Sequence, residues 1–311
     1  MFDGKTTRRA LLAAAPFAIA GAACGQEEPE VAYVLDTGLD AYGRPIAKAT
    51  INGQGPFRFL VDTGATTTVV TMDLAIALGL TFHGTSIIYG TTGSSVMPVA
   101  SATEFEVGSV RKRDLRLIAM THPLGARADG IIGADVFAGR RVVFDLNRKT
   151  VKISASRGQR SVKADTTFRL HDGRLAEVRG SIGRAKAGII IDTGADCCLL
   201  NPPLREALRV AHPGLRSLER VIVTGLTGQV LEGEGVYLPG ISMRGLNISS
   251  IVAIAVDAPV FHVWKLNEEP TMILGADVLM RLPKFSIDYG AAAFEVGPLA
   301  LLPSFLKGAW T

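Results

Sequence analysis

The sequence is poor in cysteine and in aromatic residues, and both shortages narrow the class of protein. Only three of its 311 residues are cysteines, and 6% are aromatic. Cys197 and Cys198 are adjacent, and neighbouring residues rarely meet the geometry that a disulfide requires. A small scaffold held by disulfides is therefore excluded, even for an exported chain. The low aromatic content, beside 34 glycines, favours strands and turns over a helical bundle.

Signatures of metal and nucleotide chemistry are also missing. The five histidines lack HExxH spacing and no CxxC pair occurs, so a zinc site has little support. The chain has no Walker loop, and no GxGxxG follows a strand. Its formal net charge of +4 is too small to indicate a polyanion. We therefore expect no metal, no cofactor and no nucleic-acid partner.

The overall balance of residues is that of a folded globular protein. Hydrophobic residues make up 48% of the chain and charged residues 20%, which excludes disorder over most of its length. The size is sufficient for one large core or two smaller ones. Short Val, Ile and Leu runs between glycine clusters indicate a mostly β protein.

The first residues have the pattern of an export signal. Arg8 and Arg9 precede a short apolar run over residues 10–23, and the TTRRALL segment resembles a twin-arginine signal. The run is too short to span a bilayer. We therefore expect residues 1–24 to direct export to a periplasm, the alternative being a frayed amphipathic N-terminus. Cys24 follows Gly-Ala-Ala, which loosely resembles a lipoprotein site, so membrane attachment through lipidation of Cys24 is a second alternative.

The remainder of the chain is an internal repeat. The segment from Gly43 aligns with the segment from Gly173 without a gap, at a constant offset of 130 residues. Further on, GIIGADVF matches MILGADVL and VVFDL matches FSIDY, at offsets of 142 and 143. The second copy therefore carries about a dozen extra loop residues.

Each copy has the pattern of a small β lobe. Apolar runs at 57–61 and 187–191 end at Asp-Thr-Gly, and residues 72–80 and 204–210 have helical spacing, which predicts one short helix per copy. The domain boundaries that we expect are an N-terminal lobe over 31–154, a linker over 155–167, a C-terminal lobe over 168–297 and a tail over 298–311.

The chemistry is expected in what both copies keep, which is an aspartate after an apolar strand. If the two lobes meet at these strand ends, Asp62 and Asp192 lie face to face, and two close carboxylates cannot both ionise easily. One proton would be shared. The ionised member could then take a proton from water while the protonated member polarises a carbonyl group.

Two copies of a hydrophobic strand followed by Asp-Thr-Gly-Ala, with the later Ile-Ile-Gly and Ile-Leu-Gly, resemble the aspartic proteases. The resemblance covers roughly residues 31–297 and is nearest to the retropepsin-like bacterial group, with two lobes fused in one chain. It implies a mostly β fold of two pseudo-symmetric acid-protease-like β-barrel lobes with short helices. It also implies a monomeric aspartic endopeptidase that acts on peptide or protein substrates through water held between Asp62 and Asp192.

The same resemblance assigns supporting roles near the dyad. Thr63 and Thr193 would hydrogen-bond across the lobe junction, and Gly64 and Gly194 would let backbone amides approach the carboxylates. Many acid-adapted relatives have a hydroxyl residue where this chain has alanine at positions 65 and 195. Since such a hydroxyl lowers the carboxylate pKa, we expect activity that extends toward neutral pH.

A flap over the site is implied at Tyr89, Gly90 and Thr91, which resemble a hairpin tip whose tyrosine leans over the substrate. The corresponding VTGLTG segment of the second copy has no tyrosine, which fits a single flap from the N-terminal lobe. The alternative is that Tyr89 is an ordinary strand residue beside a glycine-rich turn.

Other repeated or reactive residues have simpler interpretations. Cys197 and Cys198 lie in a strand-like run and are expected to be buried apolar residues. Asp135 and Asp277 are expected to cap short helices, and Asp145 and Asp288 to form turns. Arg44 and Arg174 either pair with such carboxylates or are solvated. None of these residues is expected to be catalytic.

Two functions other than proteolysis use the same fold. The chain could be a non-catalytic peptide-binding module, or an assembly factor in which the duplication provides dimer-like stability. Both aspartates are intact, which favours the enzyme over either alternative.

Overall fold

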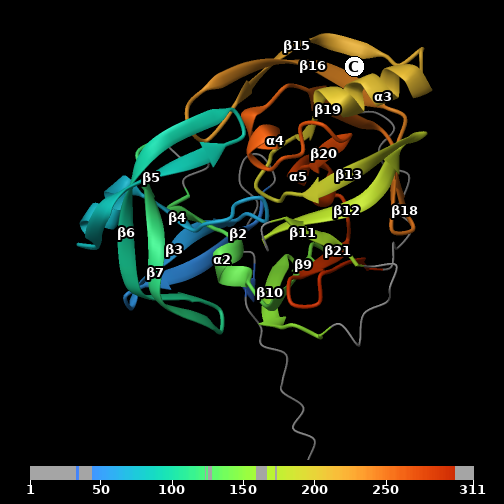
Figure 1. Ribbon diagram of the computed structural model, residues 1–311. Helices are drawn as coiled ribbons and strands as arrows, with labels where there is room; N and C mark the ends of the chain where they lie inside the picture. The colour runs from blue at the N-terminus through green and yellow to red at the C-terminus, as the bar shows by residue number, and fades with distance from the viewer. Residues whose placement is uncertain are drawn as a thin grey trace, which may run out of the picture.

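The structure is a computed structural model that describes residues 33–34, 44–122, 124, 128–158, 167–171 and 174–297. Two β lobes lie side by side and are joined by a shared sheet, at the bottom of the view in Figure 1. The mostly β, two-lobed fold that the sequence predicts is confirmed. None of the helices in the described ranges is long and apolar enough to cross a membrane.

The N-terminal lobe is a closed barrel. Its sheet has the order β2-β3-β8-β4-β7-β6-β5, and an additional pairing of β2 with β6 closes six of the strands into the barrel. The elements are β2 (Ile46–Ile51), β3 (Gln54–Val61), β4 (Val69–Thr71), α1 (Met72–Ala77), β5 (Thr81–Gly90), β6 (Gly93–Val107), β7 (Val110–Met120), β8 (Gly130–Ile132) and α2 (Ala134–Phe137).

The C-terminal lobe has the same arrangement of strands, except that two strands, β16 and β17, take the place of the long strand β6. β17 follows β16 closely in the chain and pairs with β12, the position at which β6 pairs with β2 in the first lobe. The elements are β11 (Arg169–His171), β12 (Leu175–Ile182), β13 (Ala185–Ile191), β14 (Cys198–Leu200), α3 (Pro202–Ala211), β15 (Ser217–Thr224), β16 (Val230–Leu238), β17 (Ile241–Met243), β18 (Leu246–Ile248), β19 (Ile251–Ala255), α4 (Pro259–Val263), β20 (Thr271–Leu274) and α5 (Ala276–Leu279).

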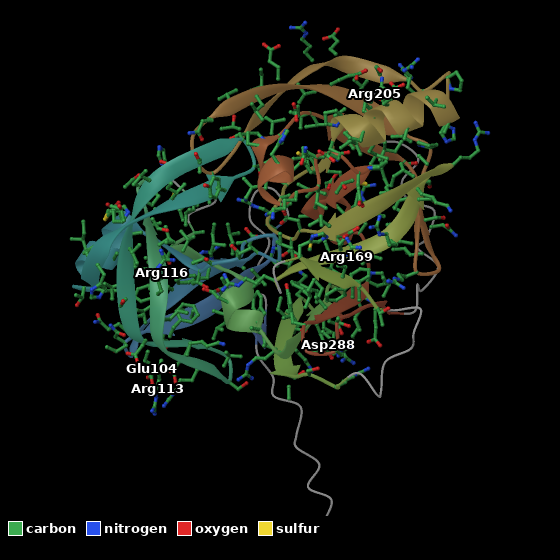
Figure 2. The ribbon with its side chains drawn as sticks, in the orientation of Figure 1. Glu104, Arg113, Arg116, Arg169, Arg205 and Asp288 are labelled. Carbon is green, nitrogen blue, oxygen red and sulfur yellow. The ribbon has the colours of Figure 1, made fainter. Side chains whose placement is uncertain are left out.

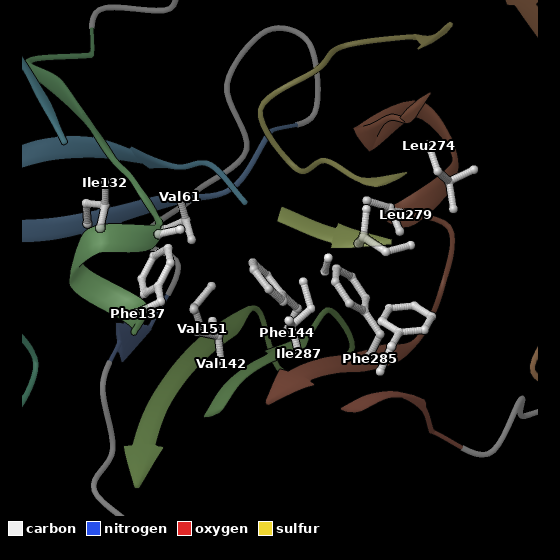
Figure 3. Close-up of a cluster of buried hydrophobic side chains, with 14 of the residues drawn as sticks. Val61, Ile132, Phe137, Val142, Phe144, Val151, Leu274, Leu279, Phe285 and Ile287 are labelled. Carbon is white, nitrogen blue, oxygen red and sulfur yellow. The ribbon is translucent and has the colours of Figure 1, made fainter. Parts of the chain in front are cut away.

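A five-stranded sheet connects the lobes. Its order is β1-β10-β9-β21-β22, built from β1 (Tyr33–Val34), β10 (Thr150–Ala155), β9 (Arg140–Asp145), β21 (Lys284–Asp288) and β22 (Ala293–Val296). The central strands β9 and β21 come from different lobes and pair in register at Phe144 and Phe285, whose rings stack at 4.5 Å. Figure 3 shows that these phenylalanines join the apolar cores of both lobes, so the lobes share one hydrophobic core.

The repeat seen in the sequence is a repeat of strand pairing. β3 runs parallel to β8, with Val61 opposite Ile132, and β13 runs parallel to β20, with Ile191 opposite Leu274. Each pair is buried on both faces, which explains the continuous apolar runs. The residue that follows β3 and the residue that follows β13 are therefore held at equivalent positions of the two lobes.

The helices differ in part from the expected ones. α1 ends at Ala77, before the predicted residue 80, while α3 extends over Pro202–Ala211. Each copy also has a second short helix, α2 or α5, instead of one helix per copy. Among the described residues α4 has no equivalent in the first copy, and it lies in the extra residues of the second. The expected domain boundaries stay a prediction, and residues 1–24, 159–166 and 298–311 lie outside the described residues.

The turns at Asp145 and Asp288 agree with the sequence. Asp145 Oδ1 accepts a hydrogen bond from Arg148 N at 3.1 Å, and Asp288 Oδ1 accepts one from Ala291 N at 3.0 Å. Asp288 lies at the end of β21 in the shared sheet (Figure 2). Both carboxylates thus hold the turns that follow the central strands, away from the cleft.

Candidate active site

Asp62 and Asp192 occupy equivalent loops at the ends of β3 and β13. Asp62 Oδ1 accepts hydrogen bonds from the amides two and three residues later, at 2.8 and 2.9 Å. Asp192 Oδ1 accepts the equivalent pair at 2.8 and 3.0 Å. Each carboxyl group is thereby fixed by its own loop, and its second oxygen remains directed to the junction between the lobes.

The two carboxyl groups meet across the lobe junction. They are hydrogen-bonded to each other, and each lies against the glycine of the opposite loop. A Cβ atom on Gly64 would be 2.3 Å from Asp192 Oδ2, and one on Gly194 would be 2.1 Å from Asp62 Cγ. Both loops therefore require glycine, because any side chain would displace the opposite carboxyl group.

Thr63 and Thr193 cross-link the two loops beneath the carboxyl groups. Both are fully buried. Thr63 Oγ1 donates to Ile191 O at 2.7 Å, and Thr193 Oγ1 donates to Val61 O at 2.6 Å. Each hydroxyl oxygen accepts a hydrogen bond from the amide of the other threonine, at 3.0 and 3.2 Å. The relative position of the two aspartates is thus fixed by buried hydrogen bonds between the lobes.

The protonation of the two carboxyl groups is coupled. Burial, and then the charge of Asp62, raise the pKa of Asp192 from the ordinary 3.8 to about 8. Burial also raises the pKa of Asp62, while the loop amides and Arg44 act in the opposite direction. Because two adjacent carboxylates repel each other, the pair retains one shared proton over a range of pH. This direction agrees with the neutral-pH activity expected from Ala65 and Ala195.

Arg44 and Arg174 have a role that neither sequence interpretation included. Arg44 Nη1 donates to Gly194 O at 3.2 Å, and Arg174 Nη1 donates to Thr66 O at 3.0 Å. Each arginine thus reaches from its own lobe to the aspartate loop of the other lobe. These bonds between the lobes are additional to what the two sequence interpretations included.

A cleft of about 330 Å³ opens between the lobes over the dyad. Apolar side chains of both lobes line it, together with the two aspartates: Leu60, Val69, Ile118, Ile131, Leu199, Val223 and Val260. α4 contacts β5 of the opposite lobe, and in Figure 1 this orange helix lies beside the teal hairpin. The extra residues of the second copy thus form one wall of the cleft.

Two hairpins, one from each lobe, meet over this cleft. Thr92 Oγ1 at the tip of β5–β6 donates to Gln229 O at 2.8 Å, and Gln229 Nε2 at the tip of β15–β16 donates to Ser94 O at 2.9 Å. Leu226, from the second tip, packs against the apolar cluster of the N-terminal lobe. Residues 223–228 thus form part of a second hairpin at the same cleft, and a single flap from the N-terminal lobe stays a prediction.

The residues predicted for the flap lie where the cleft and the first hairpin meet. Tyr89, Gly90 and Thr91 all line the cleft. Tyr89 is nevertheless 55% exposed, whereas the neighbouring Ile88 packs against the N-terminal apolar cluster. The role of Tyr89 in covering a substrate stays a prediction.

Asp135 and Asp277 are not helix caps. The helices α2 and α5 begin after Gly133 and Gly275, without a side-chain cap. Asp135 instead accepts hydrogen bonds from Thr68 N and Thr68 Oγ1, at 2.9 and 2.7 Å. The capping interpretation fails because each carboxylate lies within its helix and faces the strand that follows the aspartate loop.

The cysteines are free thiols with different surroundings. Cys198 is buried in β14, as expected, and Cys197 is half-buried and lines the cleft. Burial, and then the charge of Asp196, raise the pKa of Cys197 to about 12. A thiol with this pKa is protonated at neutral pH and is a poor nucleophile. Within the described ranges, no three His, Cys, Asp or Glu side chains gather where they could hold a metal ion.

Comparison with known protein families gives a match in both lobes. The family profile described as Aspartyl protease matches residues 47–136 and 176–278, one segment in each lobe. A search of curated proteins finds no match. The two matched segments contain the two aspartate loops, span more than half of the chain and support a protease-type function at the level of the family. The chain therefore belongs to the aspartyl protease family, with both lobes of the two-lobed, retropepsin-like form in one polypeptide.

Proposed function

We propose that the chain is an aspartic endopeptidase that hydrolyses peptide bonds with water activated between Asp62 and Asp192. The observation that carries the proposal is the pair of adjacent carboxyl groups at the cleft, half-buried Asp62 and buried Asp192, with the pKa of Asp192 raised to about 8. A pair that shares one proton provides a general base and a general acid at the same position. Thr63, Gly64, Thr193 and Gly194 support the pair in this proposal.

The reaction uses the dyad in two steps. The ionised carboxylate accepts a proton from water as the water oxygen bonds to the substrate carbonyl carbon, and the protonated carboxyl group donates its proton to the carbonyl oxygen. The product of this step is a diol. The carboxyl group that took its proton from water then donates that proton to the amide nitrogen, and the C–N bond breaks with its electron pair on nitrogen. One diol hydroxyl returns a proton to the dyad, which releases an acid and an amine and restores the starting state.

The cleft favours a peptide as the substrate. Its apolar lining comes from both lobes, and burial of aliphatic side chains there would orient a scissile bond over the dyad. The hairpin tips are joined by two hydrogen bonds, so a chain longer than the cleft requires the hairpins to separate for entry. Closure over the bound peptide would then exclude bulk water.

The direct test is cleavage of a diverse peptide library between about pH 3 and pH 8, with the full-length chain and its Asp192→Asn variant. The proposal expects a defined set of cleavage sites that is lost in the variant and blocked by a statine-type mimic of the tetrahedral state. Folding of the variant is checked by circular dichroism. Binding of the mimic without cleavage would favour a peptide-binding module, and neither binding nor cleavage would favour an assembly factor.

We also propose that the enzyme acts as a monomer after export to a periplasm, with residues 1–24 as the signal. These residues lie outside the described structure, and so does Cys24, the candidate for lipidation and membrane attachment. A paired Arg8→Lys and Arg9→Lys variant should remain in the cytoplasm if the signal is of the twin-arginine type. The mass of the mature N-terminus distinguishes cleavage from lipidation.

A further inference from the structure

The two arginines that cross the lobe junction are not equivalent. Arg44 is half-buried, lines the cleft and donates to the carbonyl oxygen of Gly194. Arg174 is exposed and donates to the carbonyl oxygen of Thr66, two residues beyond Gly64. The repeat therefore breaks its symmetry next to the dyad.

The position of Gly194 brings the charge of Arg44 close to one carboxyl group. The Cα of Gly194 packs on the carboxyl group of Asp62, where an added Cβ would be 2.1 Å from Cγ. Arg44 therefore holds the peptide that lies against Asp62. Its charge acts on Asp62 and favours the ionised form. In the other loop, the exposed guanidinium of Arg174 is bonded further from the glycine that covers Asp192.

The other titratable groups around the dyad do not replace this charge. Burial, and then the charges of Asp62 and Asp192, raise the pKa of Tyr289, so it is neutral. Cys197 faces Asp192 and is protonated at neutral pH, because burial raises its pKa to about 12. Asp196 lines the cleft and adds negative charge on the side of Asp192. Arg116 also lines the cleft but is exposed, whereas Arg44 is half-buried and its charge acts on Asp62.

We propose that Arg44 is a positioning residue that determines which aspartate is ionised, so that Asp62 is the carboxylate that accepts a proton from water and Asp192 retains the shared proton. The inference deepens the proposed peptidase function and rests on it for the two catalytic roles. The protonation states themselves do not depend on turnover. They can therefore be measured whether or not a peptide is cleaved.

The experiment is a titration of aspartate side-chain carboxyl carbons by 13C NMR in the full-length chain. Asp192→Asn leaves Asp62 as the only ionisable member of the dyad, and Asp62→Asn leaves Asp192, so the coupled titration is separated into single sites. Into each background we introduce Arg44→Gln, Arg44→Lys and the matched control Arg174→Gln. Amide spectra and melting temperatures identify any variant that does not fold.

Loss of the Arg44 charge is expected to raise the titration midpoint of Asp62 by about 1 pH unit, the effect of removing one nearby opposite charge. Arg44→Lys retains the charge and should move the midpoint less, and it supplies the test if the glutamine variant fails to fold. The midpoint of Asp192 should move less than that of Asp62, and Arg174→Gln should move neither. Equal shifts from both arginines, or a larger shift of Asp192, would overturn the inference.

A second readout connects the inference to catalysis with the peptide library as the probe. In Arg44→Gln the acidic limb of the kcat/KM profile should move to higher pH, while the alkaline limb stays in place. A uniform loss of kcat/KM at every pH would indicate a merely structural role and contradict the inference. If the NMR shift occurs but wild-type protein cleaves nothing, the proposed function fails and the charge assignment stands.

Discussion

Behind each aspartate loop, the two lobes have the same pair of hydrogen bonds, made by different side-chain atoms. In the N-terminal lobe, Thr68 Oγ1 donates to Asp135 Oδ1 at 2.7 Å and accepts from Gly133 N at 3.2 Å. In the C-terminal lobe, Cys198 Sγ lies 3.1 Å from Asp277 Oδ1 and accepts from Gly275 N at 3.4 Å. A thiol in the C-terminal lobe thus takes the place of a hydroxyl in the N-terminal lobe. In both lobes the partners are an aspartate carboxylate and a glycine amide.

The difference separates what the fold requires from what it tolerates. Gly133 and Gly275 are both needed, since a Cβ atom would be 2.7 Å from backbone atoms of Thr67 or Cys197. The donor side chain between them is less constrained. A thiol is a weaker donor than a hydroxyl, and burial raises the pKa of Asp277 in the C-terminal lobe. The backbone therefore fixes the positions of the hydrogen-bonding groups, and the choice of a hydroxyl or a thiol sets the strength of the hydrogen bonds.

The largest expected effect comes from adding a methyl group to the glycine of either aspartate loop. Gly64→Ala and Gly194→Ala place a Cβ atom 2.3 and 2.1 Å from the opposite carboxyl group. We expect kcat/KM to fall at least about 100-fold, because the two carboxyl groups are forced apart, and the free energy of unfolding to fall by about 2 kcal/mol. Peptide cleavage and urea denaturation measure the two effects.

Gly214→Ala is the matched control, since its Cβ atom would meet nothing within 4 Å. It should change the free energy of unfolding by no more than about 0.5 kcal/mol. Retention of wild-type turnover in either dyad variant would contradict the close contact of the loops.

A second prediction concerns stability against pH. The pKa of Asp192 in the folded chain is raised to about 8 from the ordinary 3.8, so the folded protein binds this proton more tightly than the unfolded chain. That contribution is fully present below pH 3.8 and is lost as the pH rises to 8. Asp192→Asn has no such charge, so its stability relative to wild type should increase over this range, by about 5 kcal/mol at pH 8. Thermal unfolding at pH 4, 6 and 8 measures the difference, and a difference that stays constant with pH would refute the prediction.

A third prediction compares the two supports directly. Thr68→Ala removes a buried hydroxyl that has two partners and should destabilise the chain by about 2 kcal/mol. Cys198→Ala removes the weaker thiol and should cost about 1 kcal/mol. Thr68→Cys, which copies the C-terminal lobe, should recover part of the loss. Chemical denaturation of the three variants provides the ranking, and a larger loss for Cys198→Ala would reverse the comparison.

The smallest effect on stability is expected at the hairpin tips. Thr92→Val removes the hydrogen bond to Gln229 O, and Gln229→Ala removes the one to Ser94 O. Each should change the free energy of unfolding by about 0.5 kcal/mol, while amide hydrogen exchange at both tips becomes faster. Thr103→Val is a control on the same strand, because its hydroxyl bonds Asn52 far from the tips. Unchanged exchange in both tip variants would show that these bonds do not hold the hairpins together.

The sequence is sufficient to predict the duplicated β lobes, the paired aspartates and the strands before them, because these depend on local pattern and on an exact repeat. The sequence also contains a signal for the second hairpin. The segment Gly90-Thr91-Thr92-Gly93 of the first copy corresponds to Gly225-Leu226-Thr227-Gly228 of the second. The two segments match at both glycines, although the second copy has no tyrosine there. Glycines at both ends of the tip are the features that form the turn.

Other features depend on contacts between lobes, which local pattern does not contain. Arg44 and Arg174 recur in the repeat, yet their partners lie on the opposite lobe. The same holds for α4, whose contact with β5 exists only once the lobes close. Asp135 and Asp277 resemble caps because they lie at the start of short helices, but their carboxylates also bind the side chains of Thr68 and Cys198, which come from outside the helix.

The central claim is that one chain supplies both aspartates of one site. The most direct measurement mixes equal amounts of the Asp62→Asn and Asp192→Asn variants of the full-length chain and assays cleavage of the peptide library. Because both aspartates of a site come from the same chain, no active site can form in the mixture, and the account predicts no recovery of activity. Recovery to about a quarter of the wild-type rate, as random pairing of chains into shared sites would give, would contradict it.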